Sequence, residues 1–268
     1  MSYIEVFGTL FDAELDGTNL STYGFYCYDI KKPLMGRQKQ ITFDPPGRPG
    51  LIQISKKFTE YELILKGYVE ADSHDDLVDT LDTLAAALYS DTDVELIISK
   101  KNDRYWNVQY LDYEIIDERD NYSLVDLKFY CADPFAYDTT ADTDTQEDVT
   151  TNDTTYNVTN SGHYYCYPTA TITFNQAQDH IYLQNNTIED CRFDISQSFA
   201  AADELIINFK TGVVTLNGTE TYEGIGVGGS ELAEMIRLAV GNNEMQVGTD
   251  DATINIDIAL SFEKVYLS

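Results

Sequence analysis

Apart from its many acids, this 268-residue chain has few residues that could do chemistry. Its three histidines, His74, His163 and His180, stand in no metal-ligand or catalytic-triad spacing. The motifs of serine hydrolases, zinc proteases and P-loop proteins are absent. With 46 acidic side chains, a pair such as Asp190 and Asp194 arises by chance and does not single out a glycosidase site. The sequence therefore predicts no catalytic residue, no cofactor and no metal.

The cysteines also point away from chemistry. Cys27, Cys131, Cys166 and Cys191 are scattered and form no CxxC pair. We expect buried free thiols in a protein made in a reducing compartment, and a Cys166–Cys191 disulfide is the alternative. No apolar run approaches the ~18 residues of a membrane span, and the first residues do not resemble a secretory signal. We expect synthesis in the cytoplasm and no membrane insertion.

Charge is the unusual feature of the composition. The chain carries 46 acids and 17 bases, a formal net charge of -29, and such a surface repels nucleic acid. One interpretation is adaptation to high salt, in which case the protein should lose its fold or assembly at low ionic strength. The other is a surface along which a polyanion slides without binding. Both interpretations stay open.

The bases are unevenly placed. Eight of the 17 lie between Lys31 and Lys66, whereas residues 139–268 hold only Arg192, Lys210, Arg237 and Lys264. The cluster indicates a region that meets an acidic neighbour, such as another copy of the chain; chance clustering on a solvated face is the alternative.

A stiff turn stands in the middle of this basic region. Asp44-Pro45-Pro46-Gly47-Arg48-Pro49-Gly50 holds three of the six prolines, so it cannot be helix or central strand. Proline fixes φ and glycine permits the positive φ of a sharp reversal. The sequence thus predicts that Arg48 is presented at a rigid corner between two strands. The candidate assembly residues are Pro46, Gly47, Arg48 and Gly50; a hairpin with an incidental arginine is the alternative.

The first domain, residues 1–138, is predicted to be mainly β with one helix. Alternating apolar residues indicate strands within 4–7, 23–32, 40–43, 51–55, 58–69, 94–98, 104–116 and 122–131. Asp16-Gly17 is typical of a hairpin turn. A helix from His74 to Tyr89, capped by Ser73, has one apolar stripe formed by Leu77, Leu81, Leu84 and Leu88. The motif Asp133, Pro134 and Phe135 closes the domain, because proline stops the last strand.

Residues 139–153 are acidic and almost free of apolar side chains, so we expect a linker without a core. Its Asp142-x-Asp144 lacks the glycine and the final glutamate of a calcium loop. The second domain, residues 154–268, is predicted to be a β-sandwich, with hairpin turns at Lys210-Thr211-Gly212 and Asn217-Gly218. A short helix is predicted from Ser230 to Val240.

In order and spacing, these motifs resemble the distal tail proteins of siphovirus-like tailed viruses over nearly the full length. The likeness rests on the turn motif Pro46-Gly47-Arg48-Pro49-Gly50, the amphipathic helix, and the string from Phe129 to Tyr137 that contains Asp133-Pro134-Phe135. Asn160-Ser161-Gly162 and Pro168 open the second domain, and Gly241-Asn242-Asn243 precedes its last two strands. Pro49 and Val240 depart from residues frequent in the family and affect local contacts rather than the fold.

The resemblance implies an N-terminal belt domain, a split β-barrel or sandwich with one helix, and a C-terminal galectin-like β-sandwich, or jelly roll. It implies a structural virion protein of the tail tip without enzyme activity. Such a protein forms a homo-hexameric ring hub between the tail tube protein and the tip or tape-measure proteins, and viral DNA passes through without specific binding.

Two other function classes compete with this one. The first is a carbohydrate-binding tail module that contacts the host surface through Tyr164, Tyr165 and Tyr167, since sugar sites use aromatic platforms; the alternative for these tyrosines is an ordinary β-sheet face. The second, less favoured, is an enzyme that acts on cell-surface polysaccharide.

Overall fold

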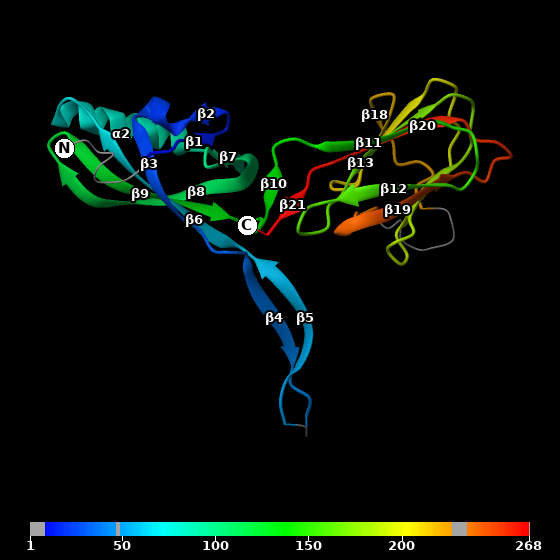
Figure 1. Cartoon of the computed structure of the whole chain (residues 1–268), viewed down its shortest axis with the longest axis horizontal. Coiled ribbons are helices and arrows are strands. Elements are labelled where there is room, and N and C mark those ends of the chain that lie inside the picture. Colours follow the sequence, from blue (N-terminus) through cyan, green and yellow to red (C-terminus); the bar gives the residue numbers. More distant parts are fainter. Residues whose placement is uncertain (1–8, 47–48, 227–234, 268) are drawn as a thin grey trace. The chain divides into compact units, whose positions relative to one another are not determined.

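The structure, a computed structural model, describes residues 9–46, 49–226 and 235–267. Antiparallel strands dominate this part of the chain, and its single α-helix is α2 (Figure 1). The chain divides into two compact units, Met1–Thr139 with Leu267–Ser268, and Thr140–Tyr266. The predicted mainly β architecture is confirmed. The strand expected over 4–7 lies outside the described residues.

The first unit is built on one twisted sheet with the strand order β2-β1-β7-β8-β9-β6-β3. Its long strand β8 pairs with β7 and β10 through its first half and with β9 through its second half. The elements are β1 (Ala13–Leu15), β2 (Thr18–Asn19), the 3-10 helix η1 (Leu20–Tyr23), β3 (Phe25–Lys31), β6 (Tyr61–Glu70), α2 (His74–Leu88), β7 (Val94–Ile98), β8 (Lys101–Arg119), β9 (Tyr122–Cys131) and β10 (Ala136–Asp138).

Helix α2 packs on strands β6 and β9 and on η1. Leu77, Leu84 and Leu88 are buried on its inner face, as the apolar stripe predicts. The Ser73 hydroxyl accepts a hydrogen bond from the Asp76 backbone N–H, so the predicted N-cap is confirmed. Alternate residues of β6 and β9 complete the core beneath the helix: Tyr61, Leu63, Leu65, Val125, Leu127 and Phe129.

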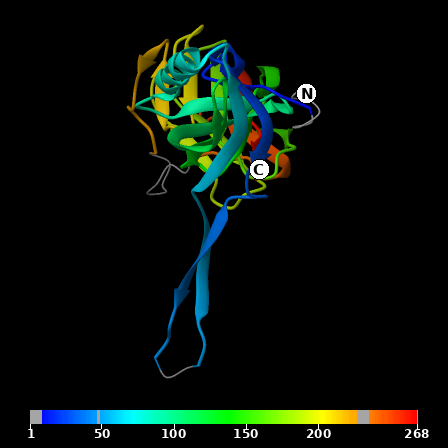
Figure 2. The same cartoon turned by 90° about the vertical axis from the view of Figure 1, so that its left-hand side faces the viewer.

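Strands β4 (Arg37–Phe43) and β5 (Ile52–Thr59) form a separate two-stranded hairpin in the first unit. Figures 1 and 2 show this hairpin reaching away from the sheet of its unit. We call residues 37–59 the arm. It includes the predicted turn motif Pro46-Gly47-Arg48-Pro49-Gly50.

The second unit consists of two antiparallel sheets, as expected for a β-sandwich. Their strand orders are β11-β20-β13-β16-β17-β18 and β12-β19-β14-β15. The predicted hairpin turn at Asn217-Gly218 has positive φ at both residues, 50° and 76°. The strands of these sheets are β11 (Asp142–Val149), β12 (Thr154–Asn160), β13 (Thr169–Phe174), β14 (Ile181–Asn185), β15 (Arg192–Ile195), β16 (Glu204–Asn208), β17 (Val213–Leu216), β18 (Thr219–Glu220), β19 (Gly241–Gly248) and β20 (Ile256–Phe262). The short strand β21 (Val265–Tyr266) is part of neither sheet.

The prediction of a linker over residues 139–153 is wrong, because most of this segment is strand β11. Its backbone pairs with β20, from Asp142 opposite Phe262 to Val149 opposite Ile256. β11 is an edge strand, and an edge strand needs backbone partners rather than apolar side chains on both faces. Acidic composition is therefore compatible with a strand at this position.

The helix predicted over 230–240 is also wrong in its described part. Residues 235–240 are not helical, and Leu238 exchanges backbone hydrogen bonds with Cys166 at 2.8 and 3.1 Å. Residues 230–234 lie outside the described part of the chain. An irregular segment of this kind must find hydrogen-bond partners elsewhere for its backbone.

Three asparagines with no exposed surface supply those partners: Asn160, Asn185 and Asn243. The Asn160 amide donates to the Leu238 carbonyl at 3.2 Å, and the Asn185 amide donates to the Arg237 carbonyl at 2.7 Å. Asn243 accepts from the Ala239 backbone N–H at 2.8 Å and donates to the Ala239 carbonyl at 2.9 Å. The asparagines of two family-like motifs thus hold this segment in place.

All four cysteines are buried free thiols, so the Cys166–Cys191 disulfide does not form. Burial raises the pKa of Cys131 and of Cys166 to about 12, from 9.0 for an ordinary thiol. The unfolded chain therefore loses these protons first as the pH rises.

We expect the free energy of unfolding to fall from about pH 9 upward, by about 1.4 kcal/mol per pH unit for each such thiol. Urea unfolding midpoints measured between about pH 8 and pH 10.5 check this. The variant C131A/C166A should show a shallower fall than the native protein. An identical pH dependence in the two proteins would contradict this assignment.

Candidate assembly and binding surfaces

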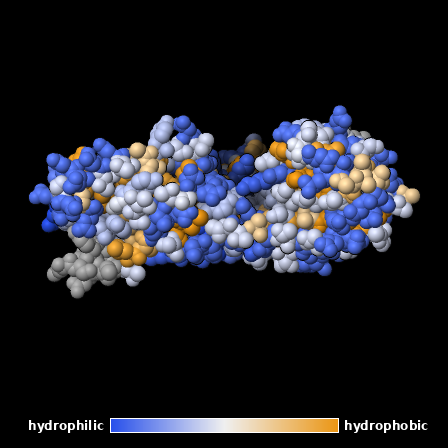
Figure 3. Space-filling model, turned by 90° about the horizontal axis from the view of Figure 1, so that it is seen from above, coloured by the Kyte–Doolittle hydropathy of each residue, from blue (hydrophilic) through white to orange (hydrophobic). Residues whose placement is uncertain are grey.

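The arm exposes large apolar side chains on strands that, within the described residues, pair only with each other. The exposed fractions are 50% for Phe43, 65% for Leu51, 41% for Ile52 and 64% for Ile54. By contrast, the face shown in Figure 3 is mostly hydrophilic, with hydrophobic residues in small separate groups. A concentrated apolar surface of this kind is typical of an interaction site.

The arm is also basic in an otherwise acidic chain. It contains one acid, Asp44, and five bases: Arg37, Lys39, Arg48, Lys56 and Lys57. A surface that is both apolar and basic fits a partner surface that is apolar and acidic.

The predicted turn motif lies between the two strands of the arm. Gly50 has a φ of 95°, a conformation that favours glycine, and a Cβ added there would meet nothing within 4 Å. Pro46 follows Asp44 and Pro45, which come after the end of β4 at Phe43. Gly47 and Arg48 lie outside the described residues, so the assembly contact expected of Arg48 stays a prediction.

The domain-closing motif holds the base of the arm. The ring of Phe135 meets the ring of Phe58, near the end of β5, edge to face with centroids 5.5 Å apart. Gly36, directly before β4, lies so close to Pro134 that an added Cβ would come within 2.6 Å of the proline Cβ. The turn motif is therefore part of the arm, and the distant motif Asp133-Pro134-Phe135 contacts the base of the same arm. We call this contact the anchor of the arm.

Replacing Phe135 with alanine should loosen the base of the arm. The half-buried ring and its contact with Phe58 are lost, at a cost of about 2 kcal/mol. Faster amide hydrogen exchange and protease cleavage along residues 37–59 would show it. Tyr89→Ala, at a ring 74% exposed in the same unit, is the control and should change neither. Unchanged exchange in the arm of Phe135→Ala would refute the anchor.

Asp133, the first residue of this motif, has a local role. Its carboxylate accepts a hydrogen bond from the Tyr137 hydroxyl and so fixes the turn between β9 and β10. Within the motif, Pro134 and Phe135 contact the base of the arm, and only Asp133 carries a charge.

The second half of β8 presents another exposed apolar surface, which we call the β8 surface. Strand β9 pairs with one edge of this half, and in the described part of the chain no strand pairs with the other. Asp112, Glu114 and Glu118 are exposed nearby. The apolar members and their exposed fractions are Leu111 at 50%, Tyr113 at 52%, Ile115 at 39% and Ile116 at 53%.

Tyr164, Tyr165 and Tyr167 lie together before β13, in a stretch that makes isolated bridges rather than a continuous ladder. The rings of Tyr164 and Tyr165 are 4.3 Å apart, and those of Tyr165 and Tyr167 meet edge to face at 5.6 Å. Burial raises the pKa of Tyr164 to about 12. Arg237 places its guanidinium 5.7 Å from the centre of the Tyr165 ring.

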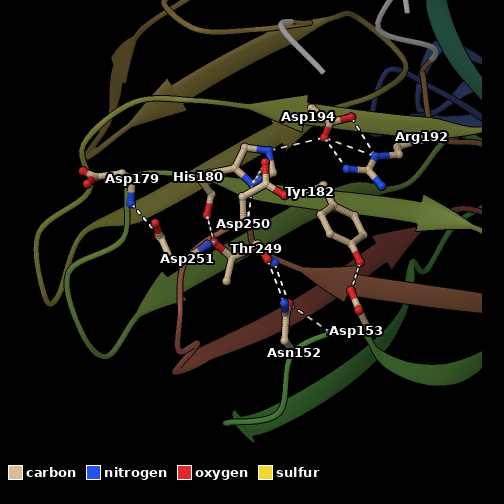
Figure 4. A network of polar contacts seen from close by, with 10 residues as sticks. All are labelled: Asn152, Asp153, Asp179, His180, Tyr182, Arg192, Asp194, Thr249, Asp250 and Asp251. Atoms are coloured by element: carbon tan, nitrogen blue, oxygen red, sulfur yellow. Dashed lines mark hydrogen bonds and ion pairs between the residues drawn. The ribbon is translucent and has the colours of Figure 1, made fainter. Parts of the chain in front are cut away.

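A polar network in the second unit links His180, Asp194 and Arg192 (Figure 4). His180 Nε2 lies 3.3 Å from an oxygen of Asp194, which also binds Arg192. His180 Nδ1 accepts the Asp250 backbone N–H at 3.0 Å. Both ring nitrogens of His180 therefore contact polar groups of the second unit.

Known protein families account for both units. A model of the phage tail protein RIFT-related domain matches residues 16–131, and a model of the siphovirus-type tail component, C-terminal domain, matches residues 161–266. The distal tail protein of Bacillus phage SPP1 is 26% identical over 231 residues, 82% of this chain and 85% of that protein. The chain belongs to the siphovirus distal tail protein family.

The fold agrees with this membership. The crystal structure of the SPP1 Dit protein, described as a paradigm of the hub adsorption apparatus in phages that infect Gram-positive bacteria, matches with a TM-score of 0.76. It is 19% identical, over 94% of this chain and 98% of that one. As a distal tail protein, the chain is a structural virion protein of the tail tip. No helix in its described part is long and apolar enough to cross a membrane.

Some residues of these surfaces escape sequence analysis. The periodicity of a strand does not show which of its faces stays exposed. The sequence therefore predicts that Ile54 and the apolar side chains of β8 lie in the core. Arg237 reads as part of a helix. The available signal for the arm is its composition, since apolar Leu51, Ile52 and Ile54 stand in a segment with five bases and one acid.

Proposed function

We propose that this distal tail protein forms a ring, with six copies, that joins the tail tube to the tip proteins and has no catalytic activity. The observation that carries the proposal is the arm, which exposes apolar and basic side chains that a lone protomer leaves uncovered. The family resemblance supplies the number six. The turn residues Pro46, Gly47, Arg48 and Gly50 would lie at the contact between copies.

The β8 surface is the best partner for the arm in a neighbouring copy. It is apolar and acidic, whereas the arm is apolar and basic, so the two surfaces complement each other. An extended hairpin can also add to an unpaired strand edge through backbone hydrogen bonds. Arm and β8 surface are different parts of the molecule, so each copy can bind the next in a head-to-tail contact, which forms a ring where the rotation from copy to copy closes.

The charge suits a ring through which DNA passes. An acidic or neutral lumen with few Lys or Arg side chains would not bind phosphates, and each avoided contact lowers the hold on the DNA. The net charge of -29 supports this role, and high-salt adaptation accounts for the same charge. The arm, which is basic, would face its neighbour rather than the axis.

The mass of the purified full chain in solution tests the ring. Native mass spectrometry and light scattering should give about six times the 30.3 kDa of one chain. A class average down the axis of the particle should show a closed ring with one density per chain. A protein that stays monomeric at high concentration, and in assembled tails, would refute the proposal.

A further inference from the structure

The few bases of the second unit differ in whether they form ion pairs with carboxylates. It holds 20 acids and four bases, so its overall charge repels anions. Arg192 binds Asp194 at 2.7 Å and Lys264 binds Asp142 at 3.0 Å. Arg237 differs: among the described residues, no carboxylate lies within ion-pair distance of it.

The side chain of Arg237 instead lies over an aromatic group. Its guanidinium is 5.7 Å from the centre of the Tyr165 ring, and that ring meets Tyr167 edge to face. Arg237 is half-buried, and Tyr167 is 36% exposed. A guanidinium that forms no ion pair with the described residues therefore stands beside a group of tyrosine rings, of which Tyr167 is exposed.

The backbone holds this pair rigidly. The Arg237 carbonyl accepts a hydrogen bond from the buried Asn185 side chain, and the next residue, Leu238, bridges to Cys166 between the tyrosines. Phe209 N–H donates to the Pro168 carbonyl at 3.1 Å, which brings the backbone of Lys210 beside the stretch that carries Tyr167. Arg237 therefore lies against the tyrosines, and the backbone at Lys210 runs beside the same stretch.

We propose that Tyr165, Tyr167 and Arg237 bind a sugar that carries a carboxylate or a phosphate. The C–H face of a sugar ring packs on an exposed aromatic ring, and the planar fork of arginine binds either anion through two parallel hydrogen bonds. Partial burial strengthens the charged contact, since fewer waters compete for the guanidinium. The rest of the unit is acidic and repels anions. An anionic sugar therefore binds where the positive charge of Arg237 attracts it.

Calorimetric and NMR titrations of the full chain test the site with four probes: glucose, glucuronic acid, glucose 6-phosphate and inorganic phosphate. At least one charged sugar should bind about tenfold more tightly than both glucose and inorganic phosphate. The two charged sugars distinguish a carboxylate site from a phosphate site. Equal binding of glucose, or of inorganic phosphate, would overturn the proposal, as would no binding of either charged sugar.

Variants separate the two parts of the site. Arg237→Gln should lower the affinity for the charged sugar about tenfold, to that of glucose, whereas Arg237→Lys should keep part of it. Tyr167→Ala should weaken every sugar, and Tyr222→Ala, at a ring 57% exposed in the same unit, should change nothing. Full affinity in both Arg237→Gln and Tyr167→Ala would refute the site. The mass of each variant in solution, which the site does not determine, keeps this test distinct from that of the ring.

Discussion

Replacing Leu51, Ile52 and Ile54 with serine should leave the protein folded and monomeric. The three side chains are exposed in the protomer, so their loss costs the fold little. Buried in a contact between copies, each stabilises it by about 1.5–3 kcal/mol. Losing all three therefore weakens the contact at least about 1,000-fold. Light scattering should report the mass of one chain, with an unchanged circular dichroism spectrum.

The control for this variant is Val78→Ser, at a side chain 45% exposed on helix α2 of the same unit. It should assemble like the native protein. An arm variant that still forms the full ring would show that the arm does not join the copies.

Complementation between two defective chains tests the head-to-tail contact itself. A second variant, with Leu111 and Tyr113 on β8 replaced by serine, should also be monomeric. When the two variants are mixed, the β8 variant contributes an intact arm. The arm variant contributes an intact β8 surface. The mixture should form one-to-one complexes and stop there. A mixture that stays monomeric would mean that the arm binds some other surface.

The second large effect is expected at Asn243. Its side chain is completely buried and bonds Ala239, Gly241 and Asn185. Leucine at this position would leave several buried backbone and amide groups without partners, each at about 1–3 kcal/mol. We therefore expect Asn243→Leu to destabilise the second unit by about 3–5 kcal/mol.

The single tryptophan allows the unfolding of the two units to be measured separately. Trp106 lies in the first unit, so its fluorescence follows unfolding there. In Asn243→Leu, the far-ultraviolet circular dichroism transition of the second unit should move to lower urea while the tryptophan transition stays. The neighbouring exposed Asn242, changed to leucine, should move neither by much. Equal stability of the two variants would contradict the role of Asn243.

Local periodicity predicted the elements whose side chains face one core. Leu77, Leu84 and Leu88 mark helix α2, and the alternation along β6 and β9 marks their buried faces. Asp16-Gly17 identifies its hairpin, because both residues need positive φ, 48° and 77°. In these places the local pattern and the tertiary environment agree.

The errors arise where distant residues decide the structure. Residues 235–240 are helix-like in pattern, but side chains of Asn160, Asn185 and Asn243 capture their backbone groups. β11 is strand because β20 pairs with it, a partner more than 100 residues away. The meeting of Phe58 and Phe135 at the base of the arm likewise depends on chain topology, which periodicity does not contain.

The four buried thiols bear on how the protein ages. A subunit of the tail tip persists in virus particles exposed to oxygen. Cys131 and Cys166, with pKa values near 12, hold almost no thiolate at neutral pH, and thiolate is the form that oxidants attack. Burial of these thiols therefore makes them poor targets for oxidation and disulfide exchange in the assembled particle.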